Sequence, residues 1–188
     1  MLRTCPTSCR PQSRLLRLTE THTMSERVYN VLFLCTGNSA RSIMAEAILN
    51  VLGKGKFRAF SAGSNPSGKV QPIAKELAEA IGYDASNVRS KNWDEFAVEG
   101  APEMDIVITV CDNAAGESCP VWLGHPALAH WGVPDPVEAT GDDDAKRRAY
   151  TAAFATLRRR IELLLSLPLD SIDRMAAQSK LRDIGKVE

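Results

Sequence analysis

The chain has 188 residues, of which 44% are hydrophobic and 24% charged, and its 23 basic and 23 acidic residues leave no formal net charge. This size predicts one domain with terminal extensions, and the composition excludes a disordered or collagen-like chain. The balanced charge excludes the basic field of a nonspecific nucleic-acid-binding protein, so an anion must be bound by local groups. No run of about 18 apolar residues occurs, and we expect a soluble protein without a membrane partner.

The two ends of the chain differ in composition from its centre. Residues 1–26 are rich in arginine and lack the apolar stretch of a signal peptide, so we expect a disordered extension, with an organellar transit segment as the alternative. This interpretation removes Cys5 and Cys9 from the chemistry. We expect one domain over residues 27–168 and a polar, partly helical tail over 169–188. Without a secretion signal, we expect a cytoplasmic protein whose thiols start reduced. We also expect a monomer.

Short apolar runs and helically spaced apolar residues alternate along the chain. The short runs predict buried strands at residues 29–35, 57–63, 104–111 and 127–133. The helical spacing predicts helices at residues 41–53, 72–82, 142–167 and 169–185, with a short helical piece at 91–98. Such alternation is typical of an α/β fold, in which a parallel sheet lies between helices as a three-layer sandwich. Its ligands bind beyond the carboxyl ends of the strands.

The first predicted strand runs directly into a loop with unusual chemistry. Five residues separate Cys35 from Arg41, and the helix opens at about Arg41. A short loop at a helix N-terminus lets backbone N–H groups converge on a tetrahedral oxyanion, which the Arg41 guanidinium can bridge. The same groups should lower the pKa of Cys35, and Ser42 can donate a hydrogen bond to its sulfur. The predicted oxyanion cradle comprises Thr36, Gly37, Asn38, Ser39, Ala40 and Arg41.

A buried cysteine at the end of a strand would explain Cys35 alone, but not its combination with a glycine, an asparagine and an arginine. The segments LCTGNSARS, MAE and FSAG together resemble the low-molecular-weight tyrosine phosphatase superfamily, and in particular its arsenate reductase branch. The resemblance runs from about Tyr29 to Leu167. It implies a four-stranded parallel sheet with the flavodoxin-like strand order 2-1-3-4.

Two further segments indicate the branch. In VCDNAAGESCPVW, Cys111 at the end of the third predicted strand and Cys119 resemble the two redox cysteines of thioredoxin-coupled arsenate reductases. In HWGVPDP, Asp135 resembles the aspartate that both branches use as a general acid. The phosphatases usually follow this Asp-Pro with two tyrosines, whereas Val-Glu-Ala follows here, which disfavours a phosphotyrosine substrate.

Other positions depart from the family pattern. Ala40 replaces a second loop cysteine, which removes a side reaction with Cys35. Some of the resembled reductases hold a potassium ion with four residues. Asn38, Glu46 and Ser61 match three of them, whereas Lys91 stands at the fourth position, where its ammonium can replace the ion. We therefore expect no required metal, and the cysteines and histidines complete no zinc site. We interpret four further side chains as structural rather than as ligands: His125, His130, Trp122 and Trp131.

The resemblance implies that arsenate is reduced to arsenite without a bound cofactor. Cys35 attacks arsenic while Asp135 protonates the departing oxygen, and Cys111 then attacks the Cys35 sulfur so that arsenite leaves with the electron pair. Cys119 moves the disulfide to an exposed segment, where thioredoxin, or glutaredoxin with a low-molecular-weight thiol, reduces it. Two alternatives stay open. One is a phosphatase in which Cys111 and Cys119 act only as a redox brake, and the other is a non-catalytic oxyanion-binding or redox-sensing module.

Overall fold

The computed structural model describes residues 27–116, 122 and 124–187, so Cys5, Cys9 and Cys119 lie outside the described residues. The described strands are β1 (Tyr29–Cys35), β2 (Phe57–Gly63), β3 (Ile106–Thr109) and β4 (Ala127–His130). The α-helices are α1 (Arg41–Leu52), α2 (Pro72–Ala80), α3 (Asp112–Gly116), α4 (Asp143–Leu165) and α5 (Arg174–Ile184). Three short 3-10 turns complete the described elements: η1 (Ala85–Asn87), η2 (Trp93–Phe96) and η3 (Pro136–Glu138).

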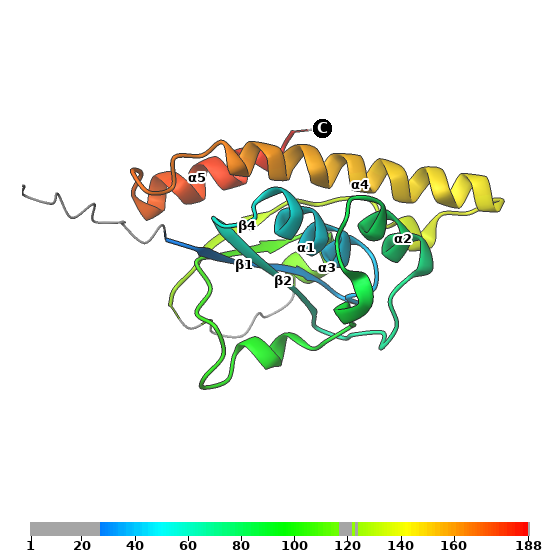
Figure 1. Ribbon diagram of the computed structural model, residues 1–188, viewed down its shortest axis with the longest axis horizontal. Coiled ribbons are helices and arrows are strands. Elements are labelled where there is room, and N and C mark those ends of the chain that lie inside the picture. Colours follow the sequence, from blue (N-terminus) through cyan, green and yellow to red (C-terminus); the bar gives the residue numbers. More distant parts are fainter. Residues whose placement is uncertain (1–26, 117–121, 123, 188) are drawn as a thin grey trace, which may run out of the picture.

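The strands form one parallel four-stranded sheet in the order β2-β1-β3-β4, which confirms the predicted fold class and strand order (Figure 1). The central strand β1 is fully buried from Val31 to Leu34, as expected for a strand covered on both faces. The register pairs Cys35 with Gly63 of β2 and Leu34 with Thr109 of β3. The carboxyl end of β1 therefore lies between the ends of two neighbouring strands.

The two faces of the sheet are covered differently. Side chains of α1, α2, α4 and α5 form a single core with one face, which includes Phe33 of β1. The opposite face carries Leu32 and Leu34, and in the described part of the chain Phe96 of η2 and Trp122 pack against it. The short helical piece predicted over residues 91–98 is thus a 3-10 turn that helps to close the second face.

The predicted polar tail folds back onto the edge of the sheet as α5. Leu181 is fully buried and Ile184 nearly so, and the indole N–H of Trp131 donates to the Leu181 carbonyl at 2.8 Å. The buried Arg160 of α4 donates to the Gly132 carbonyl at 3.1 Å. The tail is therefore part of the core, and it holds the segment that follows β4.

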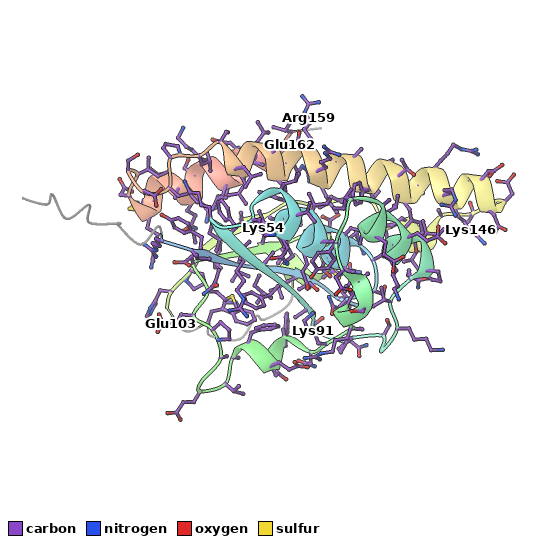
Figure 2. All side chains as sticks on the ribbon, in the orientation of Figure 1. Lys54, Lys91, Glu103, Lys146, Arg159 and Glu162 are labelled. Carbon is purple, nitrogen blue, oxygen red and sulfur yellow. The ribbon has the colours of Figure 1, made fainter. Side chains whose placement is uncertain are left out.

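The longest helix in the described part of the chain is α4, with 23 residues. Asp142 accepts a hydrogen bond from the Ala145 N–H at 2.8 Å and so caps its N-terminus. Leu157 is buried in the core, whereas Arg159 and Glu162 lie on the outer side of the helix (Figure 2). None of the described helices combines the length and the apolar character needed to cross a membrane.

Candidate functional site

The loop between β1 and α1 turns its carbonyl groups outward. Three loop carbonyls accept hydrogen bonds from backbone N–H groups, at 3.0, 2.9 and 2.9 Å: Thr36 from Asn65, Gly37 from Ser67 and Ser39 from Gln71. Each carbonyl points opposite to the next N–H across the planar peptide, so the N–H groups of residues 37, 38 and 40 face the inside of the loop. The Asn38 N–H donates to Cys35 Sγ at 3.2 Å. An oxyanion cradle requires this geometry.

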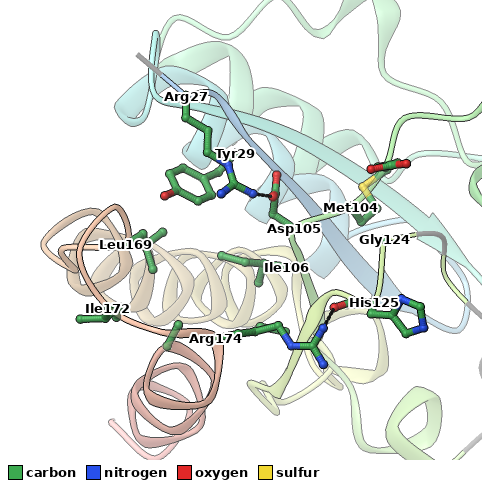
Figure 3. A pocket seen from close by; sticks show the side chains of 13 residues that line it. Arg27, Tyr29, Met104, Asp105, Ile106, Gly124, His125, Leu169, Ile172 and Arg174 are labelled. Atoms are coloured by element: carbon green, nitrogen blue, oxygen red, sulfur yellow. Dashed lines mark hydrogen bonds and ion pairs between the residues drawn. The ribbon is translucent and has the colours of Figure 1, made fainter. Parts of the chain in front are cut away.

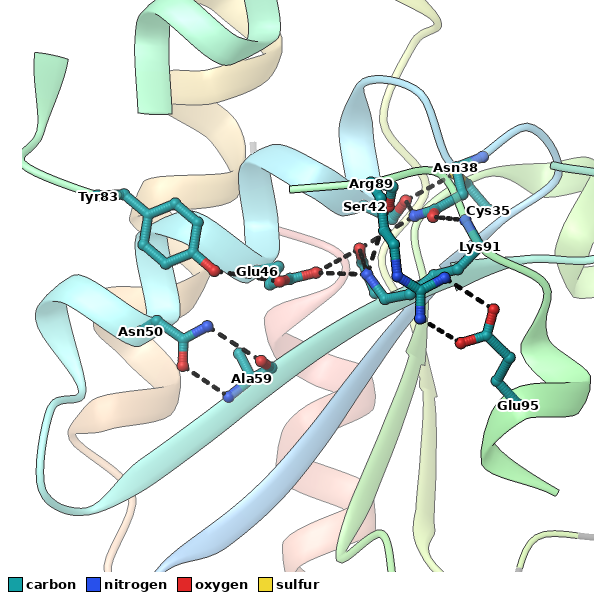
Figure 4. Close-up of polar contacts among 11 residues, drawn as sticks. Cys35, Asn38, Ser42, Glu46, Asn50, Ala59, Tyr83, Arg89, Lys91 and Glu95 are labelled. Carbon is teal, nitrogen blue, oxygen red and sulfur yellow. Dashed lines mark hydrogen bonds and ion pairs between the residues drawn. The ribbon is translucent and has the colours of Figure 1, made fainter. Parts of the chain in front are cut away.

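The Cys35 sulfur is held by polar side chains of its own loop and helix. Ser42 Oγ lies 2.8 Å from Cys35 Sγ and accepts a hydrogen bond from Asn38 Nδ2 at 2.9 Å, which leaves the Ser42 proton free to donate to the sulfur. Asn38 is fully buried, also donates to Ser61 at 3.0 Å, and has a φ of 41°. Asparagine tolerates this left-handed conformation better than most residues. The sequence predicts that Asn38 belongs to the loop, but not that its side chain links Ser42 to Ser61. Figure 4 shows this link.

Burial raises the pKa of the Cys35 thiol, although the hydrogen bonds from Ser42 and Asn38 lower it. The lowered pKa predicted from the sequence is therefore wrong for this structure. One physical reason is that the sulfur is removed from water. Another is that the Arg41 guanidinium is paired with the carboxylate of Asp135 and is not directed at the sulfur.

Arg41 and Asp135 come together from the start of α1 and the loop after β4. Arg41 Nη2 donates to Asp135 Oδ2 at 2.5 Å, and Nη1 donates to the Val133 carbonyl at 2.9 Å. The second carboxylate oxygen of Asp135 accepts the Val137 N–H at 3.0 Å and so caps η3. Arg41 and Asp135 border a cavity of about 310 Å³, which Cys111 also lines. A cationic fork, a carboxyl group and a second thiol thus share one cavity at the carboxyl edge of the sheet.

Cys111 lies just beyond the end of β3, where the chain turns into α3. Its side chain is buried, and its Sγ lies 3.7 Å from Thr36 Oγ1 and accepts the Ala114 N–H at 3.4 Å. Since β3 is the neighbour of β1, this contact brings the second thiol to the loop that begins at Cys35. The third predicted thiol, Cys119, belongs to the residues that the structure does not describe.

A lysine lies at the position that the sequence associates with a cation. Lys91 Nζ donates to Glu46 Oε2 at 3.3 Å and to Ser61 Oγ at 3.4 Å (Figure 4), and the Lys91 N–H donates to Asn38 Oδ1 at 2.8 Å. The Tyr83 hydroxyl donates to Glu46 Oε1 at 3.1 Å, and burial next to this carboxylate raises the pKa of Tyr83 to about 12. The ammonium therefore contacts two of the three predicted cation ligands. Within the described ranges, no cluster of His, Cys, Asp and Glu could hold a metal ion.

Of the other residues predicted to be structural, the two tryptophans are buried. Trp131 is fully buried and its ring lies 6.2 Å from that of Phe33, and Trp122 is also buried. His130 is half-exposed, and its ring contacts Thr109 and Asp112. The sequence did not predict this last contact, because the three residues are brought together only by the pairing of β3 with β4.

A second cavity of about 310 Å³ lies at the opposite end of the sheet (Figure 3). Arg27 there pairs with Asp105 at 2.5 Å, and Arg174 donates to the His125 carbonyl at 2.7 Å. Both arginines are therefore engaged by the protein. Parallel sheets bind their ligands beyond the carboxyl ends of the strands, so the cavity next to Arg41 is the candidate site.

Comparisons with known proteins identify the family that this chain matches. A family model described as low molecular weight phosphotyrosine protein phosphatase matches residues 30–178, a range that includes every residue of the site. An arsenate reductase of Bacillus subtilis (strain 168) is 36% identical over 116 residues, which are 62% of this chain and 80% of that protein. One from Halalkalibacterium halodurans is 34% identical over 132 residues, 70% of this chain and 91% of that protein. A solved arsenate reductase in the phosphate-binding state aligns with a TM-score of 0.56 and 28% identity, over 73% of this chain and 97% of its own.

Proposed function

Because this chain belongs to the low-molecular-weight phosphotyrosine protein phosphatase family and is similar to arsenate reductases, we propose that it reduces arsenate to arsenite. The observation that carries the proposal is the second thiol, since Cys111 Sγ lies 3.7 Å from Thr36 Oγ1 in the loop of Cys35. A phosphatase of this kind needs only one thiol, because water hydrolyses its covalent intermediate. A second thiol at this position offers a route for two electrons to reach arsenic.

The first step joins Cys35 to arsenic. Arsenate enters the loop, where the inward N–H groups and the Arg41 fork bind its oxygens. The Cys35 sulfur attacks arsenic, an oxygen of arsenate leaves, and Asp135 donates the proton that makes this oxygen part of a water molecule. The thiol proton of Cys35 restores the proton of Asp135. One S–As bond forms and one As–O bond breaks, and arsenic keeps its oxidation state.

The second step transfers the electrons. The Cys111 thiolate attacks the Cys35 sulfur, a disulfide forms, and the S–As bond breaks with its electron pair on arsenic. Arsenic is reduced from the +5 to the +3 state, the two thiols are oxidised, and arsenite leaves after protonation. Ser42 stabilises the negative charge that develops on the Cys35 sulfur when its proton leaves in the first step, because its hydroxyl lies 2.8 Å from the sulfur.

External thiols return the enzyme to its starting state. We propose that Cys119 attacks Cys111 and that thioredoxin, or glutaredoxin with a low-molecular-weight thiol, reduces the resulting disulfide. Each cycle consumes two electrons from this reductant and no bound cofactor takes part. Such a reaction belongs in the cytoplasm, where thiols are kept reduced. Arg41 and Asp135 pair within one chain, so the proposed site needs no residue of a second subunit, and we propose that the enzyme acts as a monomer.

Single-turnover chemistry tests this proposal. After one addition of arsenate, the Cys119→Ser variant should hold a Cys35–Cys111 disulfide and release one arsenite, whereas Cys111→Ser should form no protein disulfide with Cys35. Peptide mapping and arsenite assay measure both results. The competing function is hydrolysis of phosphate monoesters. Rapid release of phosphate from an aryl phosphate, without thiol-dependent arsenite formation in the wild type, would establish the phosphatase and refute the reductase.

A further inference from the structure

The imidazole of His130 bridges the two residues that flank the Cys111 turn. His130 Nδ1 lies 2.8 Å from Thr109 Oγ1, at the end of β3. His130 Nε2 lies 3.0 Å from Asp112 Oδ1, at the first residue of α3. The neutral ring can make both hydrogen bonds at once, because Nδ1 accepts from the threonine hydroxyl while Nε2–H donates to the carboxylate. One side chain of β4 therefore holds the chain on both sides of Cys111.

A glycine makes this arrangement possible. A Cβ atom at Gly132 would lie 2.7 Å from Asp112 Oδ1 and 2.9 Å from His130 Nε2, closer than side-chain carbons normally approach polar atoms. The Gly132 backbone is also fixed at its carbonyl group, which accepts a hydrogen bond from buried Arg160 at 3.1 Å. The backbone next to His130 is thus fixed, and the space beside it is taken up by the His130–Asp112 contact.

The contact bears on Cys111 because α3 is short and begins directly after it. α3 has five residues, and its Ala114 N–H donates to Cys111 Sγ at 3.4 Å. An isolated helix of this length has no stability of its own, so its position depends on what holds its ends. Cys111 Sγ lies 3.7 Å from Thr36 Oγ1, which belongs to the loop that begins at Cys35.

We propose that His130 is a positioning residue for the disulfide-forming step, which acts by holding the Cys111 turn against the catalytic loop. This inference rests on the proposed function, in which Cys111 attacks the Cys35 sulfur. His130 touches neither substrate nor sulfur and takes no part in the chemistry. Its loss lets the first turn of α3 open more often, so that Cys111 spends less time within reach of Cys35 and more time exposed to solvent.

The test compares two substitutions of the same ring with a control on the same strand. His130→Gln can keep a donor near Asp112, whereas His130→Ala loses both contacts. Leu128→Ala is the control, because Leu128 is 47% exposed on the same side of β4. In the Cys119→Ser background, His130→Ala should slow formation of the Cys35–Cys111 disulfide about fivefold, as expected for the loss of a hydrogen bond, with His130→Gln in between. Hydrolysis of para-nitrophenyl phosphate, which needs no Cys111, should change less than twofold.

A second measurement does not depend on arsenate. In a Cys35→Ser background, His130→Ala and Gly132→Ala should each raise the rate at which iodoacetamide alkylates Cys111 about fivefold, while Leu128→Ala leaves it unchanged. If the wild type forms no arsenite but this alkylation result holds, the proposed function fails and the positioning contact stands. Unchanged alkylation of Cys111 in both His130→Ala and Gly132→Ala overturns the inference. An equal loss of phosphate-ester hydrolysis and of disulfide formation in His130→Ala also overturns it, because the effect would then lie in the loop of Cys35.

Discussion

Replacing Lys91 by methionine tests whether the ammonium group substitutes for a bound cation. The side chains of Lys91 and Glu46 are only 10% and 12% exposed, and their charges lie 3.3 Å apart. Removing one partner of a buried pair costs roughly 3 to 5 kcal/mol, because the other charge stays buried. Glu46 keeps its hydrogen bonds from Ser61 and Tyr83, so we expect the lower end, about 3 kcal/mol. For a domain of this size, this corresponds to a fall in Tm of roughly 6 to 12 °C.

Thermal and urea unfolding measure the change, with Lys54→Met as the control because Lys54 is an exposed lysine (Figure 2). Potassium chloride should raise the Tm of Lys91→Met more than tetramethylammonium chloride does, since the vacated position offers the oxygens of Glu46 and Ser61 to a small cation. The wild type should respond equally to both salts. A loss of less than about 1 kcal/mol in Lys91→Met, the size of an exposed ion pair, would refute the reasoning.

Two further predictions concern the reacting groups. Burial raises the pKa of Cys35 and so disfavours its thiolate. The rate at which Cys35 is alkylated in the substrate-free protein should therefore rise with pH, with a midpoint above the ordinary thiol value of about 8.5. A midpoint below about 7 would contradict this prediction. Asp135→Asn should slow arsenate reduction by about 10² or more through loss of the acid, yet tighten binding of inorganic phosphate because Arg41 loses its competing carboxylate. Isothermal titration with phosphate checks the second effect, and weaker binding would mean that Asp135 supports the anion site.

The parts of the molecule that local sequence determines were predicted well. The strand before Cys35 and the helix from Arg41 follow from short-range apolar patterns, and the structure has both at the predicted residues. The strand order was predicted from a family resemblance and is confirmed by the sheet. β3 and β4 end before their predicted limits at residues 111 and 133, because the apolar run continues through buried residues that follow the regular strands.

Features that depend on distant contacts were missed. The pairing of Arg41 with Asp135 joins residues 94 positions apart, and no local pattern encodes it. The raised pKa of Cys35 was missed because the sequence shows the donors around the sulfur but not the depth of its burial. The packing of α5 had a readable signal, since Ala177, Leu181 and Ile184 recur at the helical spacing of a buried face.

The ion pair between Arg41 and Asp135 explains how binding of the oxyanion and proton transfer can be coupled in the proposed reaction. Without an anion, the Arg41 fork is occupied by Asp135 Oδ2 at 2.5 Å and by the Val133 carbonyl at 2.9 Å. An oxyanion that binds the fork bidentately must displace this carboxylate. The displaced carboxyl is then separated from the guanidinium and lies beside the bound oxyanion, where it can pass a proton to a substrate oxygen. Binding of the substrate therefore prepares Asp135 to act as the acid at the moment when the leaving oxygen needs a proton.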